Sequence, residues 1–242
     1  MTKNIVIGVY HFFGFHICNH LLNQGHEVIG VEWEECMAEY RDEKAMLFNR
    51  NANFTLKTLE DKLNLEQEHL ICVNLYDHLE TKDTNELWGK VVSILNQSSH
   101  PQSRILIFLP ENMNSKMNEW KQTLQTNSII QWVYVGKLYG PWLAEQDYQE
   151  LQSFSHAIYV DDFCKDWTRL LTLQKEEIHV VGEYQDGWRE QLTKGINTEI
   201  KNQEEISEPT FMIQAYTSLR SGLQAMKDHE EKLKMLQEWN EL

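Results

Sequence analysis

Two glycines between a strand-like run and a helix-like segment carry the clearest chemical signal in this sequence. Gly8 and Gly14 enclose the segment VYHFF. A strand-to-helix turn presents the N–H groups of a helix N-terminus to a pyrophosphate, and glycine allows close approach of the backbone to the phosphate. His11 stands where a middle glycine would complete the pattern. We predict that Gly8, His11, Phe12, Phe13 and Gly14 bind a cofactor; the alternative is a turn of this shape with nothing bound.

A carboxylate follows the second β-branched run of the sequence. Glu32 lies 24 positions after Gly8. An acidic residue at this place accepts hydrogen bonds from the adenosine ribose hydroxyls and repels a 2′-phosphate. We therefore expect NAD as the dinucleotide at this site, with NADP disfavoured by Glu32.

Three histidines raise the question of a metal site. His16 and His20 are four positions apart, and His11 lies upstream of both. This spacing can place two imidazoles on one metal ion, but no acidic or cysteine side chain is forced nearby as a third ligand. We predict helix packing or surface positions for these histidines and no metal site.

Four of the eight tryptophans lie near expected strand ends: Trp33, Trp132, Trp142 and Trp188. Trp33 and Trp142 fall where an open α/β sheet forms its ligand crevice. They are either ordinary core and surface aromatics or platforms on which a nucleobase or sugar stacks.

The composition excludes several classes of partner. The chain has 242 residues, 22 Lys+Arg against 37 Asp+Glu, and a formal net charge of −15. Such a charge repels phosphate backbones and anionic lipid surfaces, so we expect neither nucleic acid nor membrane as a partner. Four cysteines lie far apart without a signal peptide ahead of them, which is typical of reduced thiols in a cytoplasmic protein.

The elements that must position these residues alternate between strand and helix. Runs at 4–9 and 26–31 flank helical apolar spacing at 14–22, which predicts a right-handed βαβ unit with parallel strands. Further strand and helix segments follow at 69–75, 84–96, 104–109, 111–126 and 129–135. This order predicts an α/β fold with a Rossmann-type, doubly wound, mostly parallel sheet.

The pattern changes after Pro141. A short run at 157–160, a helix-like segment at 161–173 and a strand at 178–181 lead to a last helix from about 210 to 240. We predict a small mixed lobe and a long C-terminal helix. The apolar side of that helix packs on its own domain or, alternatively, on a partner or a second copy.

Residues 4–31 resemble the start of an extended short-chain dehydrogenase/reductase of the NAD-dependent epimerase/dehydratase type. The turn of that family reads TGxxGFxGxHL, and Gly8, Phe12, Gly14 and His16 match it. Ile7 stands for the threonine, and the middle glycine is replaced as noted above. The likeness continues at 137–141, where KLYGP is similar to the family's NVYGP.

A third match lies at 158–162, where IYVDD is similar to the family's VxDD segment, and residues 218–223 resemble its C-terminal part. The resemblance implies a Rossmann-like NAD(P)-binding domain at 1–137. It also implies a reduced substrate lobe with the C-terminal helix at 138–242. Separately, we expect a bacterial source and a cytoplasmic location.

The catalytic pattern of the family is degenerate in this chain. Its enzymes resemble one another in a Ser/Thr after the fifth strand and in a Tyr-x-x-x-Lys, whose tyrosine exchanges a proton with the substrate hydroxyl. If Lys116 is the lysine, Asn112 takes the place of the tyrosine, and an amide cannot hold and release a proton near neutral pH. Leu109 and Pro110 stand where the family has small hydroxyl residues. We assign Lys116 and Asn112 to the catalytic positions and expect no ordinary hydride transfer.

Two residues after the fourth strand depart from the family as well. Tyr76 and Asp77 replace small residues there, and the resemblance implies that they crowd or repel the nicotinamide half of a dinucleotide.

Three functions remain open. The first is a divergent relative without hydride transfer that binds a nucleotide or sugar nucleotide or serves as a scaffold. The second is an active NAD-dependent epimerase or reductase, acting on a sugar nucleotide or small carbonyl compound, in which Tyr76, Tyr139 or a substrate group replaces the tyrosine. The third is a self-associating protein, such as a homodimer, with an empty cofactor cleft.

Overall fold

The computed structural model describes most of the chain. The described residues are 3–33, 38, 40–77, 84–98, 100–111, 113, 117–144, 151, 156–183 and 211–240. They divide into two compact units, one formed by Met1–Tyr134 with Gln174–Ile178 and the other by Val135–Leu173 with His179–Leu242. Among the described helices, none combines the length and the apolar character needed to cross a membrane.

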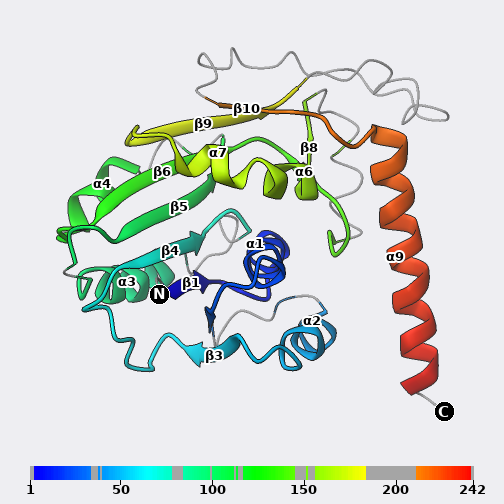
Figure 1. The fold of residues 1–242 in the computed structure, drawn as a ribbon, viewed down its shortest axis with the longest axis horizontal. Helices are drawn as coiled ribbons and strands as arrows, with labels where there is room; N and C mark the ends of the chain where they lie inside the picture. The colour runs from blue at the N-terminus through cyan, green and yellow to red at the C-terminus, as the bar shows by residue number, and fades with distance from the viewer. Residues whose placement is uncertain are drawn as a thin grey trace. The chain divides into compact units, whose positions relative to one another are not determined.

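The strands form an eight-stranded sheet in the order β10-β9-β6-β5-β4-β1-β2-β3 (Figure 1). Their bounds are β1 Lys3–Ile7, β2 Val28–Glu32, β3 Phe54–Thr58, β4 His69–Asn74, β5 Arg104–Pro110, β6 Ile129–Val135, β9 Glu177–Gly182 and β10 Phe211–Ile213. The ladders that join β3, β2, β1, β4 and β5 are parallel, as is the ladder between β9 and β10. The predicted Rossmann-type, doubly wound sheet is therefore confirmed.

Helices connect the parallel strands of the first unit. Their bounds are α1 Phe12–Asn23, α2 Arg41–Phe48, α3 Thr84–Leu95 and α4 Met117–Thr123. One helix thus follows β1, β2, β4 and β5 each, which gives the crossovers that parallel neighbours require.

The second unit has shorter elements. It contains β7 Leu138–Tyr139 paired in parallel with β8 Ile158–Tyr159, then α6 Val160–Lys165, α7 Trp167–Leu171 and the long helix α9 Leu219–Asn240. The expected helix start near residue 210 is wrong, because Phe211–Ile213 pairs with Val180–Gly182 as a strand. Alternation of buried, exposed and buried residues along these three positions suits an edge strand.

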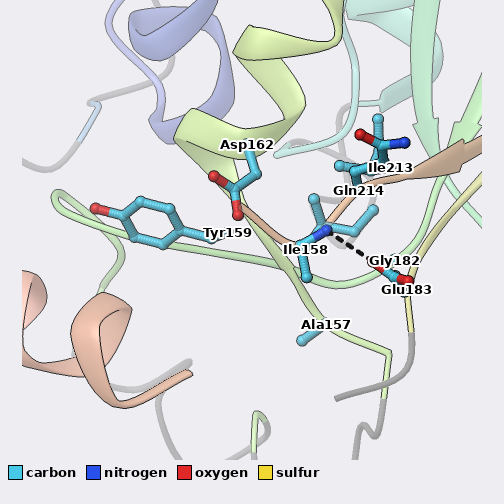
Figure 2. Close-up of a pocket in the computed structure, with 9 residues that line it drawn as sticks. Ala157, Ile158, Tyr159, Asp162, Gly182, Glu183, Ile213 and Gln214 are labelled. Carbon is cyan, nitrogen blue, oxygen red and sulfur yellow. Dashed lines mark hydrogen bonds between the residues drawn. The ribbon is translucent and has the colours of Figure 1, made fainter. Parts of the chain in front are cut away.

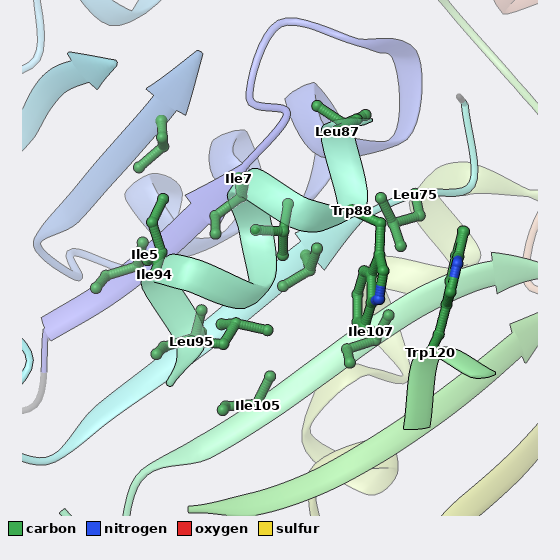
Figure 3. Close-up of a cluster of buried hydrophobic side chains, with 14 of the residues drawn as sticks. Ile5, Ile7, Leu75, Leu87, Trp88, Ile94, Leu95, Ile105, Ile107 and Trp120 are labelled. Carbon is green, nitrogen blue, oxygen red and sulfur yellow. The ribbon is translucent and has the colours of Figure 1, made fainter. Parts of the chain in front are cut away.

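A core of branched side chains lies under α3 in the first unit (Figure 3). Every second residue of β1 and β5 faces this layer, as Ile5, Ile7, Ile105 and Ile107 show. The rings of Trp88 and Trp120 stack at 4.8 Å beside it. This packing fixes the carboxyl ends of β1, β2 and β4, where the predicted site residues lie.

Candidate functional site

The predicted glycine turn is present between β1 and α1. Gly8 has a φ of +80°, and its N–H donates to the carbonyl of Val31 at 2.9 Å. His11 is the N-terminal capping residue of α1, with extended backbone angles. The position of Gly14 admits no side chain, because a Cβ there would lie 2.0 Å from the carbonyl oxygen of Gly8. Gly14 therefore allows the close approach of α1 to the turn, whereas the spacing predicted a close approach of the backbone to a phosphate.

Phe12 and Phe13 contribute backbone N–H groups to this turn, and their side chains point into the core. Both side chains are buried, and the ring of Phe13 packs edge-on against Phe108 and Tyr76, with ring centroids 5.2 Å and 5.5 Å away. As in any helix, the first-turn N–H groups of α1 point out of its N-terminus, where an anion would meet them.

A carboxylate of the chain itself lies at this N-terminus. The N–H of Phe13 donates to Asp77 Oδ2 at 2.9 Å. The buried amide of Asn74, at the end of β4, donates to the same oxygen at 2.7 Å and contacts the Gly8 carbonyl oxygen at 3.4 Å. Asp77, expected beside the nicotinamide half of a dinucleotide, thus lies where a pyrophosphate would bind.

Trp33 closes the other side of Gly8. Its ring is 2% exposed, and a Cβ at Gly8 would come within 2.8 Å of its Nε1 atom. Trp33 belongs to the same buried cluster as Ile5 and Ile7. Of the two interpretations of this tryptophan, the structure favours a core side chain.

Glu32 ends β2 as predicted, but it is buried at 4% exposure. Among the described residues, no side chain donates a hydrogen bond to its carboxyl oxygens. Burial raises the pKa of Glu32 to about 7, although Arg41, the backbone N–H of Trp33 and Lys44 each lower it in part.

Two cations of α2 lie near this carboxyl, and the sequence interpretation did not name them. The buried Lys44 ammonium donates to the carbonyl of Tyr10 at 2.9 Å, and the Arg41 guanidinium lies 5.2 Å from the centre of the Tyr10 ring. The signal in the sequence for these two cations was weak, because charged residues in a short helix are ordinarily solvated.

An NAD molecule would need the turn to offer backbone groups to its pyrophosphate and a carboxylate to its ribose. The Phe13 N–H is bonded to Asp77, the ring of Trp33 lies against Gly8, and Glu32 is buried with a raised pKa. In this arrangement the residues do not fit a dinucleotide.

The catalytic positions are only partly described. Asn112 and Lys116 lie outside the described residues. The end of β5 carries Leu109 and Pro110 and supplies no hydroxyl side chain. In the second unit, Tyr139 is completely buried, and burial is the main cause that raises the pKa of its phenol well above the usual value. A phenol of that kind is a poor general acid or base.

Two aspartates of the second unit, Asp162 and Asp166, hold the segment that precedes α9. Asp162 accepts the N–H and the hydroxyl of Thr217 and the Lys165 ammonium, each at 2.8 Å. Asp166 accepts the N–H of Gln214 at 3.1 Å and the hydroxyl of Tyr216 at 3.2 Å. These contacts fix the segment before α9.

A small pocket lies beside these contacts (Figure 2). Its lining consists of Ala157, Ile158, Tyr159, Asp162, Gly182, Glu183, Ile213, Gln214 and Ala215. Its carboxylates are already engaged, since Glu183 Oε2 accepts the Ala215 N–H at 3.2 Å and Asp162 holds Thr217. We assign this pocket a structural role.

The described residues contain no group of three or more side chains suited to a metal ion. His16 is buried and packs edge-on against Phe12 and Phe15.

Comparison with known proteins shows which solved structures share this fold. No protein-family model matches this sequence, and no curated protein matches it either. Solved structures do match: UDP-glucose 4-epimerase from Thermotoga maritima has a TM-score of 0.57 and 14% identity, covering 96% of this chain and 99% of that chain. The chain therefore shares the fold of this epimerase.

Other solved structures share this fold as well. dTDP-glucose 4,6-dehydratase from Bacillus anthracis, solved with NAD, has a TM-score of 0.60 at 12% identity and covers 96% of this chain and 97% of that chain. WbmH from Bordetella bronchiseptica, solved with NAD⁺, has a TM-score of 0.54 at 12% identity, with coverage of 95% and 98%. The resemblance drawn from the sequence is confirmed at the level of the fold.

Proposed function

We propose that this chain is a binding or scaffold protein, without hydride-transfer chemistry, built on the extended short-chain dehydrogenase/reductase fold. The observation that carries the proposal is the closed turn, defined as the contact of Asp77 with the Phe13 N–H together with the packing of Trp33 on Gly8. A cofactor enzyme keeps this place open for the pyrophosphate. The replacement of the catalytic tyrosine by Asn112 supports the same conclusion.

The ligand class that we propose is a nucleotide or a sugar nucleotide. The fold neighbours support it, because they include structures solved with UDP-glucose and with NAD. Were the turn to open and expose Glu32, its ionised carboxylate would repel a 2′-phosphate, so among dinucleotides we propose NAD before NADP. Such a ligand has to open the turn before it can bind.

The test combines turnover with binding. We expect the purified protein to oxidise no NADH with a panel of carbonyl compounds and sugar nucleotides. Turnover that disappears in Lys116→Ala would instead establish the active epimerase or reductase. Melting with NAD, NADH, NADP, NADPH, UDP-glucose and ADP-ribose tests binding, because a ligand of the native state raises Tm. If none of them shifts Tm, the scaffold form of the proposal remains and the nucleotide-binding form is wrong.

Self-association through α9 is the second candidate. Near the end of this helix, Met235 and Leu236 are 57% and 54% exposed, while Met226 and Leu233 are buried. Adjacent exposed apolar side chains of this size suit contact with another copy. We expect the Met235→Glu/Leu236→Glu variant to lower the mass measured by light scattering from dimer to monomer. Lys232→Glu is the control, because it also places a glutamate at an exposed position of α9, and it should leave the dimer intact. A parent protein that is monomeric would contradict this candidate function.

A further inference from the structure

The partial positive charge at the N-terminus of α1 is neutralised by an acidic residue that does not belong to α1. Its first turn contains no acidic residue. The unsatisfied N–H groups of a helix N-terminus carry about half a positive charge, which a nearby anion stabilises. Asp77, 64 positions away along the chain, provides that anion through its 2.9 Å contact with the Phe13 N–H.

Asp77 is held in this place by the side chain of Asn74. The Asn74 amide donates to the same Oδ2 atom at 2.7 Å, and Asn74 itself is fully buried at the end of β4. The ring of Tyr76 lies 5.5 Å from the ring of Phe13, which is the residue whose N–H is bonded. The carboxylate is therefore positioned by neighbours that belong to the folded core.

A phosphate group would compete directly with this carboxylate. Both are anions that need the same N–H groups, and two negative charges a few ångströms apart at a partly buried helix end repel each other. A ligand must then displace Asp77 or overcome the repulsion, so its affinity falls by the free energy of the internal contact.

We propose that Asp77 is an autoinhibitory internal anion, which holds the α1 N-terminus of the unliganded protein and excludes phosphate-bearing ligands until it moves. This inference rests on the proposed function, since an enzyme in constant use of a dinucleotide would not keep the contact. It assigns Asp77 and its positioning residue Asn74 a role that the family resemblance alone does not supply.

The test uses ADP as the probe and isothermal titration calorimetry of the full chain. We expect Asp77→Asn and Asp77→Ala to bind ADP about tenfold or more tightly than the parent protein, the change that about 1.4 kcal/mol represents. Asp61→Asn is the matched control, because Asp61 also accepts a backbone N–H, that of Thr58, at 2.7 Å and lies on the surface of the same unit. The control should bind as the parent does.

Two outcomes would overturn the inference. One is a parent protein that binds ADP as tightly as the two Asp77 variants. The other is the absence of binding by both variants while their melting curves show them folded, in which case the proposal of a protein without hydride transfer still stands. Should Asp77→Ala not fold, the nearly isosteric Asp77→Asn decides the result. NADH turnover by the parent protein would remove the proposed function separately.

Discussion

Replacement of Gly14 by alanine is expected to destabilise the first unit by about 3 kcal/mol or more, the upper range for an overpacked site. The added Cβ would lie 2.0 Å from the carbonyl oxygen of Gly8 and 2.9 Å from its carbonyl carbon. Both atoms belong to the backbone of the turn, so no side chain can rotate to make room. The helix has to move away from β1, which also breaks the contact of the Phe13 N–H with Asp77. Urea denaturation measures the loss.

Gly89 supplies the matched control on α3. A Cβ at this exposed helical position meets nothing within 4 Å. Gly89→Ala should therefore stabilise the protein by roughly 0.5–1 kcal/mol, the usual gain from glycine to alanine within a helix. If Gly14→Ala unfolds at the same urea concentration as the parent protein, the close packing of α1 on the turn is wrong.

The sequence predicts the centre of the sheet better than its edges. Two β-branched runs and one glycine turn are enough to predict β1, α1 and β2. The edge strand β3 escapes prediction because Thr55 and Leu56 are exposed and the segment shows no apolar run. β10 is also short, and its apolar residues continue into the pattern of α9, which led to the expected helix start near residue 210.

The contents of the turn were harder to predict than its shape. The spacing of Gly8 and Gly14 and the place of Glu32 follow from local pattern. The contact between Asp77 and Phe13 joins positions 64 residues apart, and only the register of β4 against β1 brings them together. Sequence alone thus predicted the turn but not the contact of Asp77 with the N-terminus of α1.

Glu32→Gln is expected to stabilise the protein by about 3 kcal/mol at about pH 8 and to change little at about pH 4.5. In the folded protein, burial raises the pKa of Glu32 from 4.5 to about 7. Between these values the folded state holds a proton that the unfolded state has released. The free energy of unfolding of the parent protein therefore falls as the pH rises from about 4.5 through about 7, and the charged form is buried at full cost above that range. Glutamine cannot ionise, so its variant lacks this fall.

Urea denaturation across this pH range measures the difference between the two proteins. The groups that face Glu32 are Tyr10, Arg41 and Lys44, and none of them is altered by the substitution. Glu60→Gln is the matched control, since Glu60 is an exposed glutamate of the same unit, and its curve should follow that of the parent at every pH. A Glu32→Gln variant less stable than the parent above neutral pH would mean that the carboxylate is ionised and paired in the folded state. The raised pKa of Glu32 would then be wrong, and Glu32 would no longer count against binding of a dinucleotide.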